Sequence, residues 1–292
     1  MIDYLAAIAT IIAIQSLLTL GLTFQYGLTG LVNFGHVAFY ALGAYSSALL
    51  TLAGWPMPAA MAMGVVLAVA ASVLVGATTL RLREDYFAIL TLGFSELLRM
   101  LLMNARDLTR GTLGIPGIPR PFAGWLPGND QVVYLVMVLI AMAAAYVLCE
   151  LLARSPLGRT LRAIRDDDHA AIAFGKNVLK FRLTAFGWGA GLASVAGSFW
   201  AHYVTYVVPD QFTPDITFYT WMAMIIGGPG SMVGALWGTT ALVAVVEGTR
   251  FIKDVVPIDE VKLAALRQVA IGLGLIFLTV YLRNPSRRRR QK

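Results

Sequence analysis

Two pairs of polar side chains interrupt long apolar stretches, and they are the residues best placed to act on a solute. Asn33 and His36 are three residues apart, as are Glu96 and Arg99. Ionisable groups are costly in an apolar segment, so they often line a substrate pathway or a gate. At this spacing each pair shares one face of a helix. We take all four as candidate pathway residues. The alternatives are interior packing for the first pair and a structural ion pair for the second.

The sequence offers no catalytic constellation and no cofactor or metal site of its own. Cys149 is the single cysteine and has no partner for a disulfide or a metal cluster. A phosphate-binding loop needs Gly-x-x-x-x-Gly-Lys-Ser/Thr, whereas Gly175 and Lys176 are followed by Asn177 and lack the upstream glycine. Uphill transport by this chain would therefore need ATPase partners or an ion gradient.

The composition places these residues in a membrane. Of 292 residues, 58% are hydrophobic and only 13% are charged, which excludes an ordinary soluble enzyme and a disordered chain. We predict an all-α polytopic membrane protein of about eight to nine transmembrane helices that forms a single domain over 1–292. A net charge of +7 then reflects topology and not nucleic-acid binding. The predicted spans are 4–24, 31–53, 57–80, 86–103, 131–153, 183–204, 216–228, 231–249 and 267–282.

The basic residues orient these spans. Seven lie in 154–182, six lie in the tail 283–292, and Arg81 and Arg83 lie together, which assigns these stretches to the inside. The stretches 104–130, 205–215 and 251–266 are assigned to the outside. Nine spans satisfy this pattern with the N-terminus outside and the C-terminus inside. If 31–53 is re-entrant, the count falls to eight and the N-terminus moves inside. Around Gly227 to Gly230 we expect either a tight turn between two spans or a break within one.

The inside stretch 154–182 reads as two short helices. Ser155 and Pro156 are typical of a helix start, and Gly175 is typical of a helix end. Between them, Asp166 to Asp168 can cap the second helix. The functional interpretation is a helix with a small-residue face that is presented to a cytosolic partner. The alternative is a solvated connector whose arginines only set the topology.

Five stretches together resemble one known family. They are Gly30 to Tyr45, Arg81 to Gly93, Thr109 to Pro119, Ser155 to Asn177 and Ile226 to Gly234. The chain is similar, over about residues 15–283, to permease subunits of ATP-binding-cassette importers of the LivM type, which serve branched-chain amino acids.

The resemblance implies partners and sites. It implies a second, LivH-like permease subunit, two cytosolic ATPase subunits that hold ATP and Mg, an extracytoplasmic substrate-binding protein and the lipid of a bacterial cytoplasmic (inner) membrane. The binding protein would dock at Gly114, Pro116 and Pro119. The ATPase-coupling residues would be Ser155, Gly158, Arg159, Arg162, Arg165, Asp168, His169, Ala170, Ala171 and Gly175. His169 and Ile172 depart from the family pattern, which has an acidic residue at the first position and usually a polar or acidic one at the second.

Two other functions stay open. The same machine could carry urea or short amides, because related permeases share these motifs. A protein of a different class, an ion-coupled secondary transporter or a channel, would use an acidic residue deep in the membrane. Glu96 is the good candidate for that role, but Arg99 lies beside it.

Overall fold

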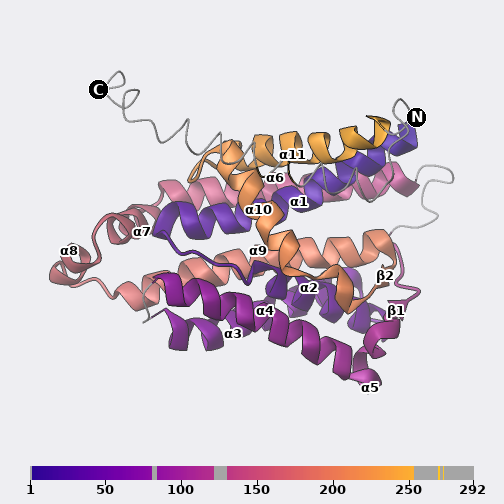
Figure 1. Cartoon of the computed structure of the whole chain (residues 1–292), viewed down its shortest axis with the longest axis horizontal. Coiled ribbons are helices and arrows are strands. Elements are labelled where there is room, and N and C mark those ends of the chain that lie inside the picture. Colours follow the sequence, from indigo (N-terminus) through magenta and orange to yellow (C-terminus); the bar gives the residue numbers. More distant parts are fainter. Residues whose placement is uncertain (1, 81–83, 122–129, 253–268, 270–271, 273–292) are drawn as a thin grey trace.

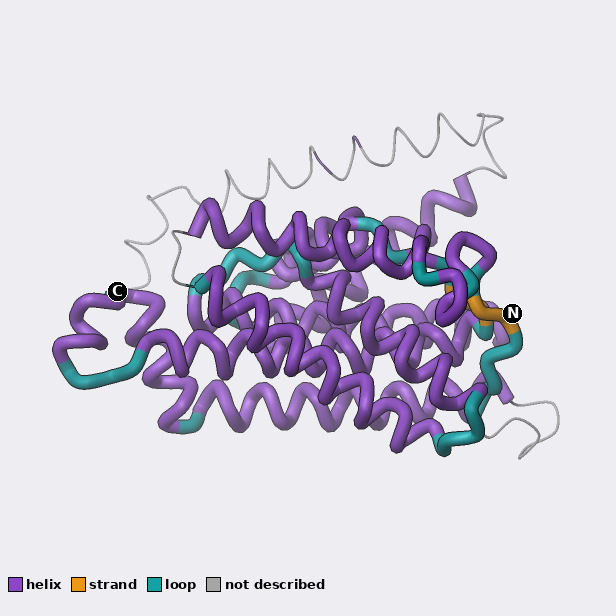
Figure 2. The backbone as a smooth tube through the Cα atoms, turned by 90° about the horizontal axis from the view of Figure 1, so that it is seen from below, coloured by secondary structure: helices purple, strands orange, loops and turns teal. Residues whose placement is uncertain are grey.

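The computed structural model describes residues 2–80, 84–121, 130–252, 269 and 272, and it is almost entirely helical. The long helices lie roughly along one axis, with short elements gathered at both ends (Figure 1, Figure 2). The elements are α1 (Ile2–Thr29), α2 (His36–Leu52), α3 (Met57–Thr79), α4 (Glu84–Asn104), α5 (Arg106–Thr109), η1 (Gly111–Leu113), β1 (Ile115–Pro116), α6 (Asp130–Arg154), α7 (Pro156–Asp166), α8 (Asp168–Ala173), α9 (Val178–Val204), β2 (Tyr206–Val207), η2 (Pro209–Gln211), α10 (Pro214–Gly227) and α11 (Met232–Ile252).

Helix α9 forms the centre of the bundle. It packs against α1, α2 and α3, and one side of it is largely buried. Two glycines allow α2 and α9 to cross closely: a Cβ on Gly43 would overlap the Ser194 carbonyl, and a Cβ on Gly197 would overlap the Tyr40 carbonyl. Close approach of this kind through small residues is how membrane helices maximise their packing.

The number of spans is only partly settled by the described residues. Helices α1, α3, α4 and α6 are long and apolar enough to cross a membrane, and a bent helix pair formed by Pro209–Gly227 and Met232–Gly248 brings the number to five if the pair is one span. The predicted count of eight to nine is therefore not confirmed. The predicted span 267–282 and the basic tail 283–292 lie outside the described residues.

The region around Gly227 to Gly230 is a sharp reversal. The helices before and after it make a bend of 118°. Gly228 and Gly230 have φ angles of 92° and 91°, a backbone conformation that residues with a side chain rarely adopt. Gly227 and Gly234 lie against each other's carbonyls, so α10 and α11 touch directly below the turn. The structure therefore has a sharp break between two helices, which fits both predicted forms.

The short elements separate into two groups at opposite ends of the bundle (Figure 1). At one end β1 pairs antiparallel with β2, in the register Ile115 to Val207, and joins the two stretches that were predicted to lie outside. At the other end lie α7 and α8, from the stretch predicted to lie inside. The N-terminus lies at the β1 end, as the nine-span pattern requires (Figure 1).

Candidate functional site

An extended segment, residues 30–35, interrupts the apolar stretch that was predicted to be one helix from 31 to 53. Gly30, with φ of 74°, turns the chain out of α1, and α2 begins only at His36. Asn33 therefore does not share a helix face with His36, which corrects the prediction. Broken helices at membrane depth are typical of transporter sites, provided that the backbone is enclosed in protein.

Side chains supply the hydrogen bonds that a helix would have given this segment. The Phe34 N–H donates to Thr91 Oγ1 at 3.1 Å, and the Val37 N–H donates to Thr217 Oγ1 at 3.0 Å. The Trp221 indole N–H donates to the Asn33 carbonyl at 3.0 Å. The extended conformation is stable because α4 and α10 satisfy its backbone groups.

A buried network of hydrogen-bonded polar side chains lies beside the extended segment. Asn33 Nδ2 donates to Gln25 Oε1 at 3.0 Å and lies 3.5 Å from His36 Nδ1, while His36 Nε2 lies 3.1 Å from the Leu18 carbonyl. Gln25 Nε2 in turn donates to the Phe186 carbonyl on α9 at 2.9 Å. These contacts fit an imidazole that carries its proton on Nε2.

The side chains of this network, Gln25, Asn33 and His36, are fully buried. In this conformation the network therefore joins α1, α2 and α9 and is not accessible to a solute. A pathway role for Asn33 and His36 stays a prediction. Sequence reasoning missed Gln25, although a single amide inside the apolar run of α1 was a signal for it.

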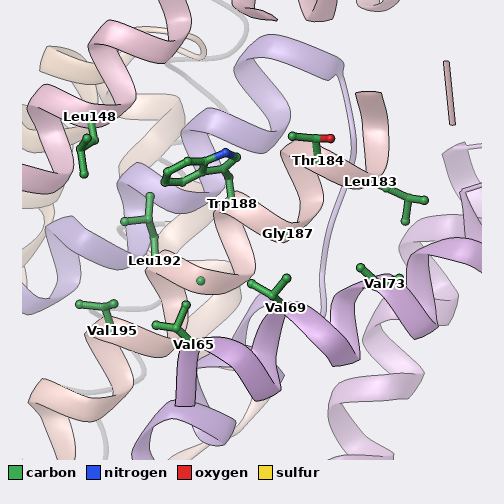
Figure 3. A pocket seen from close by; sticks show the side chains of 11 residues that line it. Val65, Val69, Val73, Leu148, Leu183, Thr184, Gly187, Trp188, Leu192 and Val195 are labelled. Carbon is green, nitrogen blue, oxygen red and sulfur yellow. The ribbon is translucent and has the colours of Figure 1, made fainter. Parts of the chain in front are cut away.

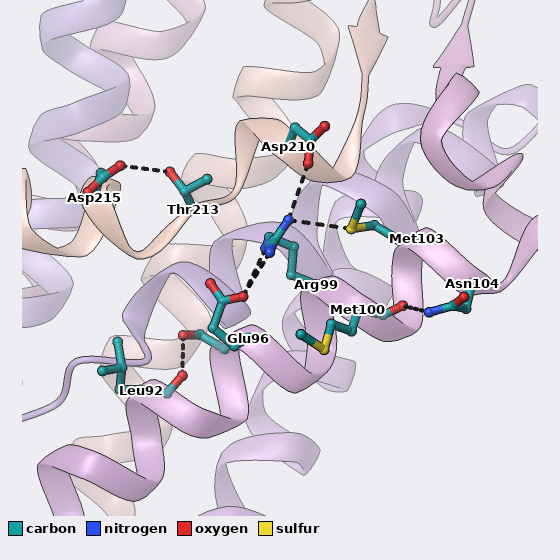
Figure 4. Close-up of polar contacts among 10 residues, drawn as sticks. Leu92, Glu96, Arg99, Met100, Met103, Asn104, Asp210, Thr213 and Asp215 are labelled. Atoms are coloured by element: carbon teal, nitrogen blue, oxygen red, sulfur yellow. Dashed lines mark hydrogen bonds and ion pairs between the residues drawn. The ribbon is translucent and has the colours of Figure 1, made fainter.

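The second pair, Glu96 and Arg99, forms an ion pair and acquires a third member (Figure 4). Arg99 Nη2 lies 2.9 Å from Glu96 Oε2, and Arg99 Nη1 lies 3.2 Å from Asp210 Oδ1 in η2. The predicted pairing is confirmed, and the Asp210 contact is new. The guanidinium thus ties α4 to the loop before α10, and it neutralises Glu96.

The loop at the opposite end is built as its sequence predicted. Ser155 Oγ accepts the Gly158 N–H at 3.5 Å and caps α7, and Asp167 accepts the His169 and Ala170 N–H groups and caps α8. Gly175, with φ of 72°, closes α8: its N–H donates to the Ile172 carbonyl, and the next N–H donates to the Ala171 carbonyl. These two hydrogen bonds together form the Schellman motif of a helix end.

The exposed surface of α8 is more apolar than predicted. Ala171 is buried, whereas His169 and Ala170 are exposed. Ile172 is 57% exposed and Phe174 is 83% exposed, which is unusual for large apolar side chains in a polar loop. Sequence reasoning treated Ile172 as a departure and missed Phe174. Asp168 forms an ion pair with Arg182 at 2.7 Å and holds α8 onto α9.

Two of the three arginines on α7 bind other helices of this chain. Arg162 Nη1 donates to the Ala153 carbonyl at 2.9 Å, and Arg165 Nη1 donates to the Gly27 carbonyl at 2.6 Å. Both carbonyls belong to the last turns of helices, α6 and α1, where a cation is favoured by the helix dipole. Arg159 is exposed and contacts only the nearby Arg154 carbonyl among the bonds of the described residues.

Arg165 enters a junction of three segments. Its Cγ lies 3.3 Å from where a Cβ of Gly30 would be, so it sits at the turn between α1 and the extended segment. Gly27, whose carbonyl it binds, packs directly on Gly230 in the turn between α10 and α11. The residues Gly27, Gly30, Arg165 and Gly230, here called the inner junction, connect the two-helix loop to both irregular parts of the bundle.

At the other end, the three residues proposed for docking do not share one environment. Gly114 is buried against Val207 and Val208, whereas Pro116 and Pro119 are exposed. The Pro119 carbonyl lies 2.7 Å from His202 Nδ1, and His202 Nε2 lies 2.9 Å from Ser47 Oγ. The fully buried His202 of α9 thus joins the outer loop to α2.

The comparisons with known proteins agree with this architecture. The family model described as "Branched-chain amino acid transport system / permease component" matches residues 4–282. The LivM permease protein of the high-affinity branched-chain amino acid transport system of Escherichia coli K12 is 36% identical over 265 residues, which cover 81% of this chain and 61% of that protein. Its counterpart LivM in Salmonella typhimurium is 35% identical over 264 residues, with the same coverage of 81% and 61%.

LivH of E. coli K12, the other permease protein named for that system, is 27% identical over 241 residues, which cover 76% of this chain and 77% of LivH. No solved structure matches. The chain spans about 61% of the length of the two LivM relatives. The match over residues 4–282, together with the apolar helices, shows that this multi-pass membrane protein belongs to the permease family of branched-chain amino acid transport systems.

Proposed function

We propose that this chain is the membrane-spanning permease subunit of an ATP-driven importer in a bacterial cytoplasmic (inner) membrane. Two cytosolic ATPase subunits, which hold ATP and Mg, close against the α7–α8 loop. A LivH-like permease subunit completes the translocation path. An extracytoplasmic binding protein docks at the β1–β2 end and delivers branched-chain amino acids.

The observation that carries this proposal is the tip of α8. A short helix, capped at both ends, holds Ile172 and Phe174 in solvent at the end of the molecule where the basic residues gather. Exposing two large apolar side chains in water is unfavourable by roughly 1.5–3 kcal/mol each relative to burial, so a partner that covers them gains that free energy. A plain connector has no need of such a tip.

The inner junction gives the loop a route into the bundle. Arg165 links α7 to the end of α1, and Gly27 links α1 to the turn between α10 and α11. A movement of the loop that follows ATPase closure would therefore shift the extended segment and the α10–α11 pair together. Both are irregular parts of the bundle, where a change of access costs the fewest regular helix contacts.

The ion-coupled alternative has less support. A coupling carboxylate must bind and release its ion, and Glu96 is held at 2.9 Å by Arg99, which also binds Asp210. Import of urea or short amides stays open as the same machine with another cargo. Identifying the ligand of the partner binding protein distinguishes the two cargoes. A branched-chain amino acid supports the proposal, whereas urea or an amide changes only the substrate of the same importer.

The docking is tested by reversing the character of one exposed side chain at each end. Phe174→Glu should abolish co-purification of the ATPase subunits and ATP-dependent uptake, with an unchanged amount of the protein in the membrane. Leu113→Glu, which alters a side chain that is 77% exposed at the opposite end, should retain the ATPases and weaken binding-protein capture.

Each variant is thus the control for the other. If Phe174→Glu retains the ATPases and the uptake, the assignment of α8 is wrong. If the unmodified chain co-purifies with no ATPase at all, the importer proposal itself is wrong.

A further inference from the structure

A groove between α3, α6 and α9 contains no charged side chain and has a volume of about 590 Å³ (Figure 3). Its walls are valines of α3, Leu148 of α6 and apolar residues of α9. The one side-chain hydroxyl in its lining belongs to Thr184, and this hydroxyl is already bonded to the Lys180 carbonyl at 2.9 Å. The groove therefore offers a ligand mainly dispersion contacts, and its polar groups are the Thr184 hydroxyl and the indole N–H of Trp188.

Two glycines of α9 form the floor of the groove. Gly187 and Gly191 are one turn apart, and a Cβ on either would come no closer than 3.5 Å to the side chains of α3. At the α2–α9 crossing, by contrast, backbone atoms of the facing helix occupy the space where a Cβ of the glycine would lie. Gly187 and Gly191 are instead faced by side chains of α3 at ordinary van der Waals distance, beside Trp188, which is 36% exposed.

The dimensions suit a lipid chain. From Thr184 to Val195 the floor extends roughly 16 Å along α9 at 1.5 Å per residue. One leaflet of the hydrocarbon core is about 15 Å thick. A volume of about 590 Å³ along that length leaves room for an extended acyl chain.

The charge at one end identifies the head group. Lys180 precedes Thr184 by one turn on the same face of α9 and is exposed. It lies toward the end of the bundle that holds α7 and α8, where basic residues are concentrated. The cytoplasmic leaflet of a membrane carries anionic lipids, which attract such residues.

We propose that this groove binds one acyl chain of an anionic phospholipid of the inner leaflet, with the phosphate at Lys180. The site is separate from the inner junction and from the outer loop. Because α9 also holds Gln25 through the Phe186 carbonyl, the bound chain stiffens the wall of the bundle that supports the buried polar network.

Trp188 provides the test, because brominated acyl chains quench indole fluorescence on contact. The full transporter complex is reconstituted in phosphatidylcholine vesicles that contain a small fraction of dibrominated phosphatidylglycerol or dibrominated phosphatidylcholine. The contribution of Trp188 is the difference between the unmodified protein and Trp188→Phe. The brominated anionic lipid should quench it at a several-fold lower fraction than the brominated zwitterionic one.

Matched variants make the result specific. Gly191→Leu should fill the groove and remove the quenching of Trp188, and Val69→Phe should do the same from the opposite wall. Gly93→Leu, on α4, should leave it unchanged, because in the part of the chain that the structure describes no other element comes within 4 Å of its Cβ position. Lys180→Glu should abolish the preference for the anionic lipid. Trp237, which is 71% exposed on α11, serves as the reference for ordinary contact with bulk lipid.

Two outcomes overturn the proposal. Equal quenching by both lipids, unaffected by Gly191→Leu and Val69→Phe, means that the groove contacts only bulk lipid. No quenching by either lipid, together with loss of the second permease subunit from the Gly191→Leu complex, means that a protein side chain occupies the slot.

Discussion

At the scale of single residues, Arg165 links the two-helix loop to the end of α1. Its guanidinium satisfies a carbonyl that has no partner within its own helix, at the end of α1. Such a contact can transmit displacement because a charged hydrogen bond to a helix end has both direction and strength. Arg162 makes the same kind of contact to α6 within the loop's own neighbourhood.

We expect Arg165→Gln to uncouple transport from ATP hydrolysis. A hydrogen bond to a charged group contributes about 1.5–3 kcal/mol, so a loss of about tenfold in uptake is expected while the assembled complex still hydrolyses ATP. The measurement is the number of substrate molecules imported per ATP in proteoliposomes. Arg165→Lys should recover part of this ratio.

Arg154→Gln is the matched control, since Arg154 is a cation of the same end whose side chain is 78% exposed and bound to Glu150. It should leave the ratio unchanged. A parallel fall of uptake and hydrolysis in Arg165→Gln would show that Arg165 only supports assembly.

At the scale of elements, the crossing of α2 and α9 determines how well the bundle packs. We expect Gly197→Ala to lower the melting temperature of the purified protein, because the new methyl group would overlap the Tyr40 carbonyl and force the helices apart. Overpacking of this kind costs typically 1–3 kcal/mol. The measurement is thermal unfolding in detergent, monitored by size-exclusion chromatography.

Gly93→Ala on α4 gives the opposite expectation. No atom of the described residues outside its own helix turn lies within 4 Å of its Cβ position, and alanine favours a helix over glycine by about 1 kcal/mol, so the melting temperature should stay or rise. Equal losses in the two variants would contradict the packing argument.

Local chemistry explains which elements the sequence could predict. The caps at Ser155 and Gly175 were predictable because a cap depends on residues within one turn. The start of α2 was not predictable from hydropathy, since the partners that hold Asn33 and Phe34 in an extended form come from Thr91 and Trp221. For the same reason, the helical spacing of Arg165 indicates which face of α7 it lies on, but not that the Gly27 carbonyl accepts its hydrogen bond.

At the scale of the whole molecule, the two ends carry opposite assignments that a single labelling experiment can test. In Leu113→Cys and Phe174→Cys the new thiols replace side chains that are 77% and 83% exposed, and the native Cys149 is buried and should not react. A membrane-impermeant maleimide should label the first variant in intact cells and the second only after the membrane is opened.

The reverse pattern would invert the whole topology, including the side on which the ATPases are proposed to bind. Labelling of both variants in intact cells would contradict the placement of the two loops on opposite sides. Unmodified protein, with Cys149 at 1% exposure, serves as the background for both.

The extended segment also determines when this protein can finish folding during its synthesis. Residues 33–37 are made before their partners: the groups that complete their hydrogen bonds lie 57 residues later at Thr91, 180 residues later at Thr217 and 188 residues later at Trp221. An unpaired backbone group costs several kcal/mol in lipid. Until α10 arrives, this part of the nascent chain must keep contact with water or with the insertion machinery. Completion of the native fold therefore waits for the last third of the chain, and a product truncated before α10 keeps at its centre backbone groups that have no hydrogen-bond partner.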